Sequence, residues 1–184
     1  MTHSLIAIEN EDGSVTGVYC HSDGYFEYVG WLLYAHYRDI TKVKELISLG
    51  ALSSLGARIG DKIDMNRYMR DIDYYRKYQC QVVAYHRDRG EELEYSHYKN
   101  KVEFTKMQDF TYLYIFSNGV WQAKDCSSNR KLMKLETILK EVLKGQKEDL
   151  IKTYVEERGE DEFGYGYTSE EREIFRKAIE ELKL

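Results

Sequence analysis

The stretch YLYIFSNGVWQA, residues 112–123, contains the clearest secondary-structure pattern in this chain. Aromatic and aliphatic residues alternate on both sides of Asn118 and Gly119. A two-residue type I′ turn needs positive φ at both positions, and Asn-Gly is the pair that adopts it most readily, so a β-hairpin is predicted here. Toward the N-terminus, residues 4–9 and 14–19 are two β-rich runs around a glycine-containing turn, which predicts a second hairpin.

After the first hairpin the apolar residues change to a helical period. Residues 29–36 and 43–47 each place their apolar side chains on one helical face, and Gly50 follows the second helix as a C-terminal cap residue. Asp23 is predicted to cap the first helix. His36 lies on the apolar face, which favours a packed core histidine over a ligand. The expected fold class is α+β: an antiparallel sheet built from hairpins, with this helical pair packed on it.

The middle of the chain has weaker patterns. Residues 56–78 are charged and aromatic with little periodicity, and a loop with one short helix is expected there. Residues 79–87 favour a strand and residues 92–98 a return strand, with a turn at 87–91 between them.

The C-terminal third is predicted to be helical. Apolar stripes mark helices at residues 132–142 and 150–155, and residues 159–167 are predicted to form a flexible, acidic linker. Thr168 and Glu171 then have the spacing of a capping box, which predicts the start of a last helix. We therefore divide the chain into an α+β core domain, 1–126, and a C-terminal helical extension, 127–184. The extension either folds back or pairs with a second copy to give a homodimer.

Length and composition limit the classes of function. The chain has 184 residues, of which 42% are apolar, and a net charge of -5. Such a charge argues against a general nucleic-acid binder, although a local basic patch or a basic protein partner remains compatible with it. We expect a cytoplasmic protein, because no apolar run is long enough for a membrane span and the N-terminus does not resemble a signal peptide. Scattered histidines and three separate cysteines predict no metal site, and no cofactor motif is present.

The segment YCHSDGY, residues 19–25, is the first candidate for chemistry. His21 and Asp23 stand at a strand-to-helix junction, where they could act as a base with its orienting partner, or as acid and base in phosphodiester cleavage. The structural alternative is that Asp23 caps the helix while Gly24 permits the sharp turn. This alternative explains Asp23 and Gly24 without any catalytic role.

The segment AYHRDRGE, residues 84–91, is the second candidate. His86, Arg87 and Arg89 would form a local positive edge that clamps phosphates or carboxylates. A solvated turn whose charges compensate one another is the alternative. The candidate catalytic set is therefore His21, Asp23 and His86. The candidate RNA- or partner-binding set is Tyr25, Tyr85, Arg87, Arg89, Tyr95 and His97.

Three segments together resemble a family of small proteins encoded by bacteriophages and prophages. They are SLIAIENEDGSVTGVYCHSDGYFEYVG with the following LLYAHYRDITKVKELISLGALSSLG, then VAYHRDRGEE, then YLYIFSNGVW. The resemblance spans residues 4–125, and this chain departs from the family pattern at Ser22 and Phe26. It implies a role against host defence, since proteins of this kind include inhibitors of type II CRISPR–Cas, one of them acting with truncation of the guide RNA. It implies no particular catalytic residues.

Three functions follow as hypotheses. The first is an anti-CRISPR inhibitor that binds a Cas9–guide RNA complex, to which the acidic charge and the abundance of tyrosine are suited. The second is a small endoribonuclease that truncates the guide RNA. The third is a phage structural or regulatory binding protein.

Overall fold

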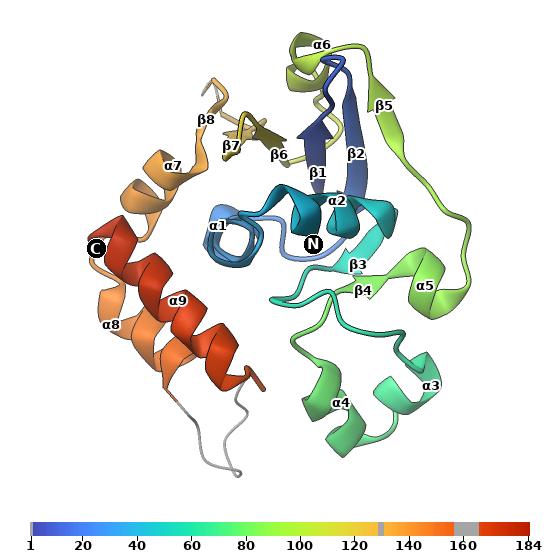
Figure 1. Ribbon diagram of the computed structural model, residues 1–184, viewed down its shortest axis with the longest axis vertical. Helices are drawn as coiled ribbons and strands as arrows, with labels where there is room; N and C mark the ends of the chain where they lie inside the picture. Colours follow the sequence, from blue (N-terminus) through green and yellow to red (C-terminus); the bar gives the residue numbers. More distant parts are fainter. Residues whose placement is uncertain (1, 129–130, 157–165) are drawn as a thin grey trace.

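A computed structural model describes residues 2–128, 131–156 and 166–184, and within this part of the chain eight strands form one sheet (Figure 1). The strands are β1 Ser4–Glu9, β2 Val15–Cys20, β3 Leu52–Ser54, β4 Val83–Ala84, β5 Ser96–Tyr98, β6 Tyr112–Ser117, β7 Val120–Asp125 and β8 Met133–Lys134. The helices are the π-helical turn η1 Phe26–Gly30, α1 Trp31–His36, α2 Ile40–Ser48, α3 Met65–Tyr68, α4 Ile72–Tyr78, α5 Tyr85–Arg89, α6 Lys101–Thr105, α7 Leu135–Val142, α8 Lys147–Leu150, the π-helical turn η2 Ile151–Val155 and α9 Ser169–Leu182.

Both predicted hairpins are confirmed, and they share one sheet. β1 pairs antiparallel with β2, and β6 with β7. The second turn has φ of 51° at Asn118 and 76° at Gly119, as its sequence required. β1 and β6 join the hairpins by a parallel pairing that runs from Ser4 opposite Tyr112 to Ile8 opposite Phe116. The sheet is therefore mixed, where a wholly antiparallel sheet was predicted.

The outer edge of β2 forks between two partners. β5 pairs with residues 15–17 at one end of β2, while β3 pairs in parallel with Cys20 at the other end. β4 then continues the sheet beyond β3. Because of this fork, the ends of β2, β3 and β4 lie next to one another although the sequence separates them by some thirty residues each.

The two faces of the sheet are covered unequally. Helices α1 and α2, with the C-terminal helices, cover one face, and the core there includes the fully buried Trp31 and Phe175 (Figure 1). A smaller cluster on the opposite face is closed by Phe104 of α6. The predicted helical pair packed on the sheet is thus confirmed.

The C-terminal helices fold back onto the body of the chain. Phe175 of α9 lies 5.8 Å from Trp31 and 4.3 Å from His36, measured between ring centroids. His36 is 5% exposed, so it is a packed core histidine as expected. The capping box of Thr168 and Glu171 is present, with each side chain accepting from the backbone N–H of the other residue. Most of the predicted linker, 159–165, lies outside the described residues.

The predicted hairpin over residues 79–98 is wrong. Of the predicted first strand, 79–87, Val83 and Ala84 alone form β4, and residues 85–89 form α5. The predicted return strand is shortened to β5, which pairs with β2 and not with residues 79–87. The cause is Asp88, whose buried carboxylate accepts from the backbone N–H groups of Ala84 at 2.7 Å and Ile63 at 2.9 Å. Alternation of residue types could not reveal this contact, because half of it comes from a distant loop.

The roles predicted for Asp23 and Gly24 are also wrong. Asp23 has φ of 55° and caps no helix, since η1 begins only at Phe26 and has no side-chain cap. Gly24 instead has an ordinary φ and lies against the first strand, where a Cβ would be 2.8 Å from the Cβ of Ser4. Glycine is therefore required by close packing and not by the turn.

Two short helices, α3 and α4, replace the single one expected within residues 56–78. Among the described residues, no helix is both long and apolar enough to cross a bilayer.

Candidate functional site

Two histidines and a tyrosine form a hydrogen-bonded cluster at the end of the first hairpin. The register pairs Leu5 with Tyr19, so residues 3, 19 and 21 project from the same face of the sheet. The Tyr19 hydroxyl lies 2.8 Å from Nδ1 of His3 and 2.6 Å from Nδ1 of His21. The two imidazole rings are 4.9 Å apart between centroids. All three side chains are half-buried, so the cluster is within reach of solvent.

The hydrogen bonds assign opposite tautomers to the two imidazoles. Nδ1 of His3 also lies 2.9 Å from the backbone carbonyl oxygen of His21, which can only accept, so this nitrogen carries the proton. The Tyr19 hydroxyl is then left to donate to Nδ1 of His21. Nε2 of His3 therefore holds a lone pair, while neutral His21 carries its proton on Nε2.

The position of Tyr19 keeps its hydroxyl protonated. Its ring packs 6.2 Å from that of Phe110, and burial, reinforced by the phenol of Tyr85, raises the pKa of Tyr19. A phenol with a raised pKa remains a donor at neutral pH. Tyr19 thus orients both histidines, and no hydrogen bond joins Asp23 to His21 within the described structure.

The fork in the sheet connects Arg89 to the segment that carries His21. The backbone N–H of Ser22 donates to the carbonyl oxygen of Ser53 at 3.1 Å, and Arg89 Nη2 donates to Oγ of the same serine at 3.1 Å. The guanidinium also lies 4.8 Å from the ring centroid of Tyr85. Ser53 therefore connects the two segments singled out in the sequence, bonding to the backbone of Ser22 in the first and to the side chain of Arg89 in the second.

The other two charged residues of α5 are placed differently. Arg87 lies in an ion pair with Asp88, at 2.9 Å, and donates to the backbone carbonyl oxygens of Ile59, Gly60 and Val82. Its guanidinium is committed to holding the loop, which leaves little for a ligand. His86 is exposed, and its Nδ1 lies 2.7 Å from the carbonyl oxygen of Glu91.

The remaining candidates lie on separate parts of the surface. Tyr95 donates its hydroxyl to the carbonyl oxygen of Ser48, and His97 lies next to it at 6.2 Å between ring centroids. Tyr25 is 36% exposed and lies near Tyr28. None of these three has a described contact with the histidine cluster.

His3 is the site residue that sequence reasoning missed. A pattern was nevertheless available, because a hairpin that pairs Ser4 with Cys20 places residue 3 opposite residue 21 when its register is extended by one step. Cys20, by contrast, points to the other face, where burial raises its pKa to about 12 and removes it as a nucleophile. Among the described residues, no group of three or more His, Cys, Asp or Glu side chains could hold a metal ion.

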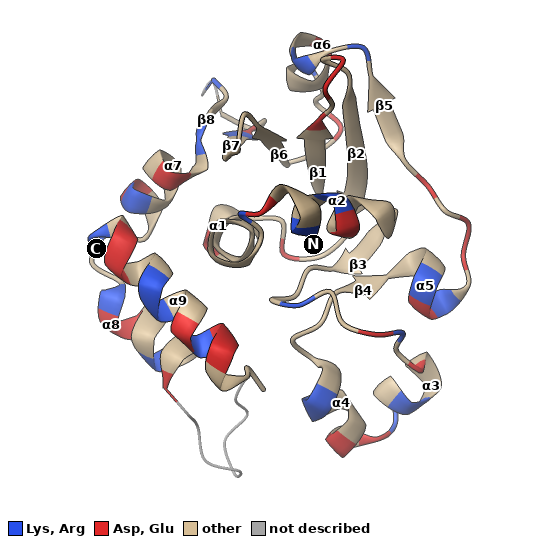
Figure 2. Cartoon of the chain, viewed as in Figure 1, with Lys and Arg blue, Asp and Glu red and all other residues tan. Residues whose placement is uncertain are grey.

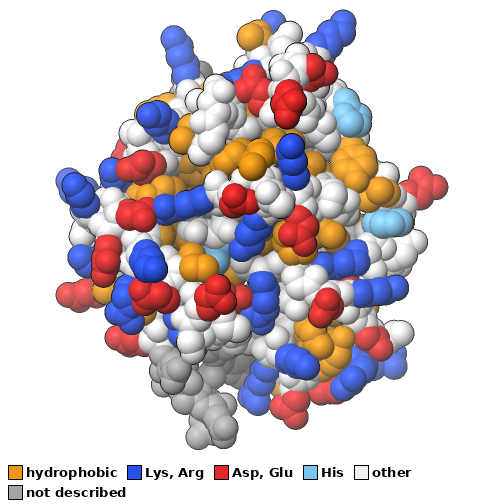
Figure 3. Space-filling view, viewed as in Figure 1, with side chains coloured by type: hydrophobic (Ala, Val, Ile, Leu, Met, Phe, Trp, Pro, Cys, Tyr) orange, Lys and Arg blue, Asp and Glu red, His pale blue; other side chains and the backbone are white. Residues whose placement is uncertain are grey.

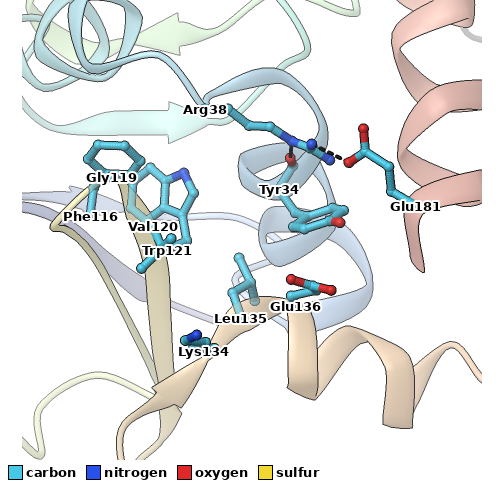
Figure 4. A pocket seen from close by; sticks show the side chains of 10 residues that line it. All are labelled: Tyr34, Arg38, Phe116, Gly119, Val120, Trp121, Lys134, Leu135, Glu136 and Glu181. Atoms are coloured by element: carbon cyan, nitrogen blue, oxygen red, sulfur yellow. Dashed lines mark hydrogen bonds and ion pairs between the residues drawn. The ribbon is translucent and has the colours of Figure 1, made fainter. Parts of the chain in front are cut away.

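A separate pocket of about 300 Å³ lies at the opposite end of the sheet. Phe116, Trp121 and Leu135 form its apolar wall, and Arg38 and Glu181, which form an ion pair with each other, also line it (Figure 4). Trp121 directs its indole N–H away, to the carbonyl oxygen of Tyr37. The pocket contains none of the residues singled out in the sequence.

No protein-family model, curated protein or solved structure matches this chain.

Proposed function

We propose that this protein is a phage-encoded anti-defence protein that cleaves RNA, with the guide RNA of a type II Cas9 complex as its target. The observation that supports cleavage is the histidine pair, in which Tyr19 holds His3 and His21 with opposite tautomers. One ring is prepared to accept a proton and the other to carry one outward, which is the requirement of general acid–base catalysis.

The reaction that suits this pair is an internal transesterification of RNA. Nε2 of His3 takes the proton of a ribose 2′-hydroxyl, whose oxygen attacks the adjacent phosphorus. The bond from phosphorus to the 5′-oxygen breaks, and His21, doubly protonated for this step, gives its Nε2 proton to that leaving oxygen. His21 then keeps the proton on Nδ1, so that its hydrogen bond with Tyr19 runs from Nδ1 to the hydroxyl oxygen. The products are a 2′,3′-cyclic phosphate and a 5′-hydroxyl, with no oxidant or other reactant needed.

Arg89 supplies the positive charge that such a reaction needs. Phosphorus passes through a state with additional negative charge on its oxygens, and a guanidinium beside it lowers the energy of that state. Ser53 and Tyr85 hold the Arg89 side chain in place. Arg87, already bonded to Asp88, is assigned to the support of α5.

The choice of guide RNA as the target rests on the family resemblance of residues 4–125. The charge distribution agrees with an enzyme that acts on one particular RNA. The chain is acidic overall, and the basic residues on α5 are followed by an acidic segment before β5 (Figure 2). Such a protein binds RNA locally, and not through a broad basic surface.

Incubation with guide RNA alone, with Cas9 alone and with the assembled complex tests this proposal. The expected result is shortened RNA that ends in a 2′,3′-cyclic phosphate. His3→Ala and His21→Ala should each abolish shortening, while His86→Ala should retain it. RNA that stays intact with the wild-type protein, or equal cleavage by His21→Ala, would refute the assignment.

Inhibition by binding alone is the second candidate function, and one observation favours it. Met69, Ile72 and Tyr75 on the α3–α4 segment are exposed at 76%, 51% and 36%, and apolar side chains lie among basic ones in this region (Figure 3). Exposed apolar groups of this kind are typical of a protein-docking surface. Co-elution with Cas9 without RNA cleavage, lost in Met69→Ser, would support this function instead.

A further inference from the structure

A cleft of about 600 Å³ lies between the start of α3 and the end of α5. This volume falls within the range of ~300–1,000 Å³ that is common for ligand sites. The cleft is lined by Lys62, Ile63, Asp64, Met65, Asn66, Tyr74, Asp88 and Arg89. Among these, Arg89 is the residue that also contacts Ser53, which bonds to the backbone of Ser22 next to His21.

The charged side chains of the cleft differ in how far they are free to contact a ligand. Asp64 accepts from the backbone N–H groups of Asn66 and Arg67, and Asp88 is buried against Arg87. Asp88 is therefore neutralised by an ion pair, and one carboxylate oxygen of Asp64 is taken up by the first turn of α3. Lys62 is exposed and makes no ion pair or side-chain hydrogen bond with another described residue. The groups left to a ligand are two cations, Lys62 and Arg89, which favours a phosphate-bearing ligand.

Arg89 links the cleft to the segment that carries His21. On one side the guanidinium donates to Ser53, whose carbonyl oxygen accepts from the backbone of Ser22, next to His21. On the other side Arg89 forms a wall of the cleft beside Lys62. An RNA strand that binds in the cleft would therefore lead from Lys62 past Arg89 toward the segment that carries His21.

We infer that this cleft binds a single-stranded segment of RNA adjoining the bond that is cleaved, an inference that rests on the proposed function. Lys62 and Arg89 contact successive phosphates. A cleft of this volume beside one helix end has room for a single strand, whereas double-stranded RNA is bound across a wide surface. In-line attack by a 2′-hydroxyl also needs a backbone that is free to bend away from the A-form helix.

Binding can be measured separately from cleavage. The probe is a short fluorescein-labelled RNA with 2′-O-methyl riboses, which lacks the nucleophile, and its fluorescence anisotropy is followed with the full chain at several salt concentrations. Lys62→Ala should weaken binding about fivefold and lower the slope of log K against log salt by about 0.7, the value for one lost phosphate contact on a single strand. Lys106→Ala, at an exposed lysine directly after α6, is the matched control and should change neither.

The outcomes separate this inference from the proposed function. Equal affinity and salt slope for Lys62→Ala and Lys106→Ala would overturn the assignment of the cleft as the RNA-binding site. Tighter binding of the same sequence as a duplex would overturn it as well. If the wild-type protein cuts RNA while Lys62→Ala keeps an unchanged KM, the cleft is refuted and the cleavage stands. If the probe binds through Lys62 but unmodified RNA is never cut, the cleavage is refuted and the cleft stands.

Discussion

At the scale of single residues, Tyr19 organises the candidate active site. Its hydroxyl contacts both histidines, and its ring packs on Phe110. A side chain that holds two reactive groups contributes through their orientation, so it acts as a positioning residue. This separates its hydroxyl, which affects the reaction, from its ring, which affects stability.

Tyr19→Phe should therefore lower kcat/KM for RNA cleavage about 100-fold, the lower end of what general acid–base catalysis contributes, while the protein stays folded. The phenylalanine ring keeps its packing on Phe110. The pH profile should change as well, because the two imidazoles lose their common partner. Tyr95→Phe removes a hydroxyl bonded to Ser48 and is the control. Cleavage by Tyr19→Phe at the wild-type rate would contradict the role of the Tyr19 hydroxyl in positioning the two histidines.

His36 should make the stability of the protein depend on pH. Burial, with Lys42 and Arg38 nearby, lowers the pKa of His36 from an ordinary 6.5 to about 3. The unfolded chain thus binds a proton that the folded chain refuses, so stability falls as the pH drops from 6.5 toward 3. Between pH 7 and pH 5 this residue should remove about 2 kcal/mol. Urea denaturation at both pH values measures it.

The matched pair for that measurement is His36→Leu and His97→Gln. The first should flatten the dependence on pH, because it removes the buried base, whereas His97 is exposed and its loss should leave the dependence as it is. Identical pH dependence in the wild-type protein and in His36→Leu would exclude His36 as the cause.

At the scale of elements, α5 depends on one buried carboxylate. Asp88 accepts two backbone N–H groups and pairs with Arg87, and its side chain is completely buried. These contacts connect β4, the loop before α3 and α5 itself. The position of Arg89 in the candidate site therefore follows from the burial of its neighbour.

Asp88→Ala should lower the free energy of unfolding by about 3–5 kcal/mol, because it leaves the guanidinium of Arg87 largely buried without its partner. Asp73→Ala, at a side chain that is 88% exposed, should change it by less than about 0.5 kcal/mol. Chemical denaturation of the two variants provides the comparison. A loss below about 1 kcal/mol for Asp88→Ala would mean that other contacts hold α5.

Helices, strands and turns were predictable from the sequence where residues close in sequence determine them. Asn118 and Gly119 determine their turn by their own φ preferences, and Thr168 caps a helix three residues away. The helix at 85–89 was not predictable, because its cause is a contact with Ile63. In the candidate site, His21 and Arg89 were singled out from the sequence, while His3 required the register of the finished hairpin.

At the scale of the whole molecule, the C-terminal helices and the first helix share one core. Phe175 is fully buried and lies between the rings of Trp31, His36, Tyr154 and Tyr167. The same cluster includes residues of β1 and β6. Of the two alternatives for the C-terminal helices, the described residues thus show the one in which their apolar faces fold back onto the chain.

Phe175→Ala should lower the free energy of unfolding by about 3–5 kcal/mol, the usual loss for a buried phenylalanine. Denaturation should remain one cooperative transition by both circular dichroism and tryptophan fluorescence, since Trp31 is on the far side of the proposed boundary at residue 126. Lys177→Ala, on the exposed face of α9, is the control. Two separate transitions in Phe175→Ala would show that residues 1–126 fold as a domain of their own.

The parallel pairing of β1 with β6 also has a consequence for synthesis on the ribosome. Ser4 pairs with Tyr112, so the second strand of this pair is translated 108 residues after the first. At the usual ~5–20 residues per second, the first hairpin waits roughly 5–20 s with one edge of β1 unprotected. Refolding of the full chain should also be slow, because the paired strands β1 and β6 are far apart in the sequence. During translation, the unpaired edge of β1 is where a chaperone would be needed most.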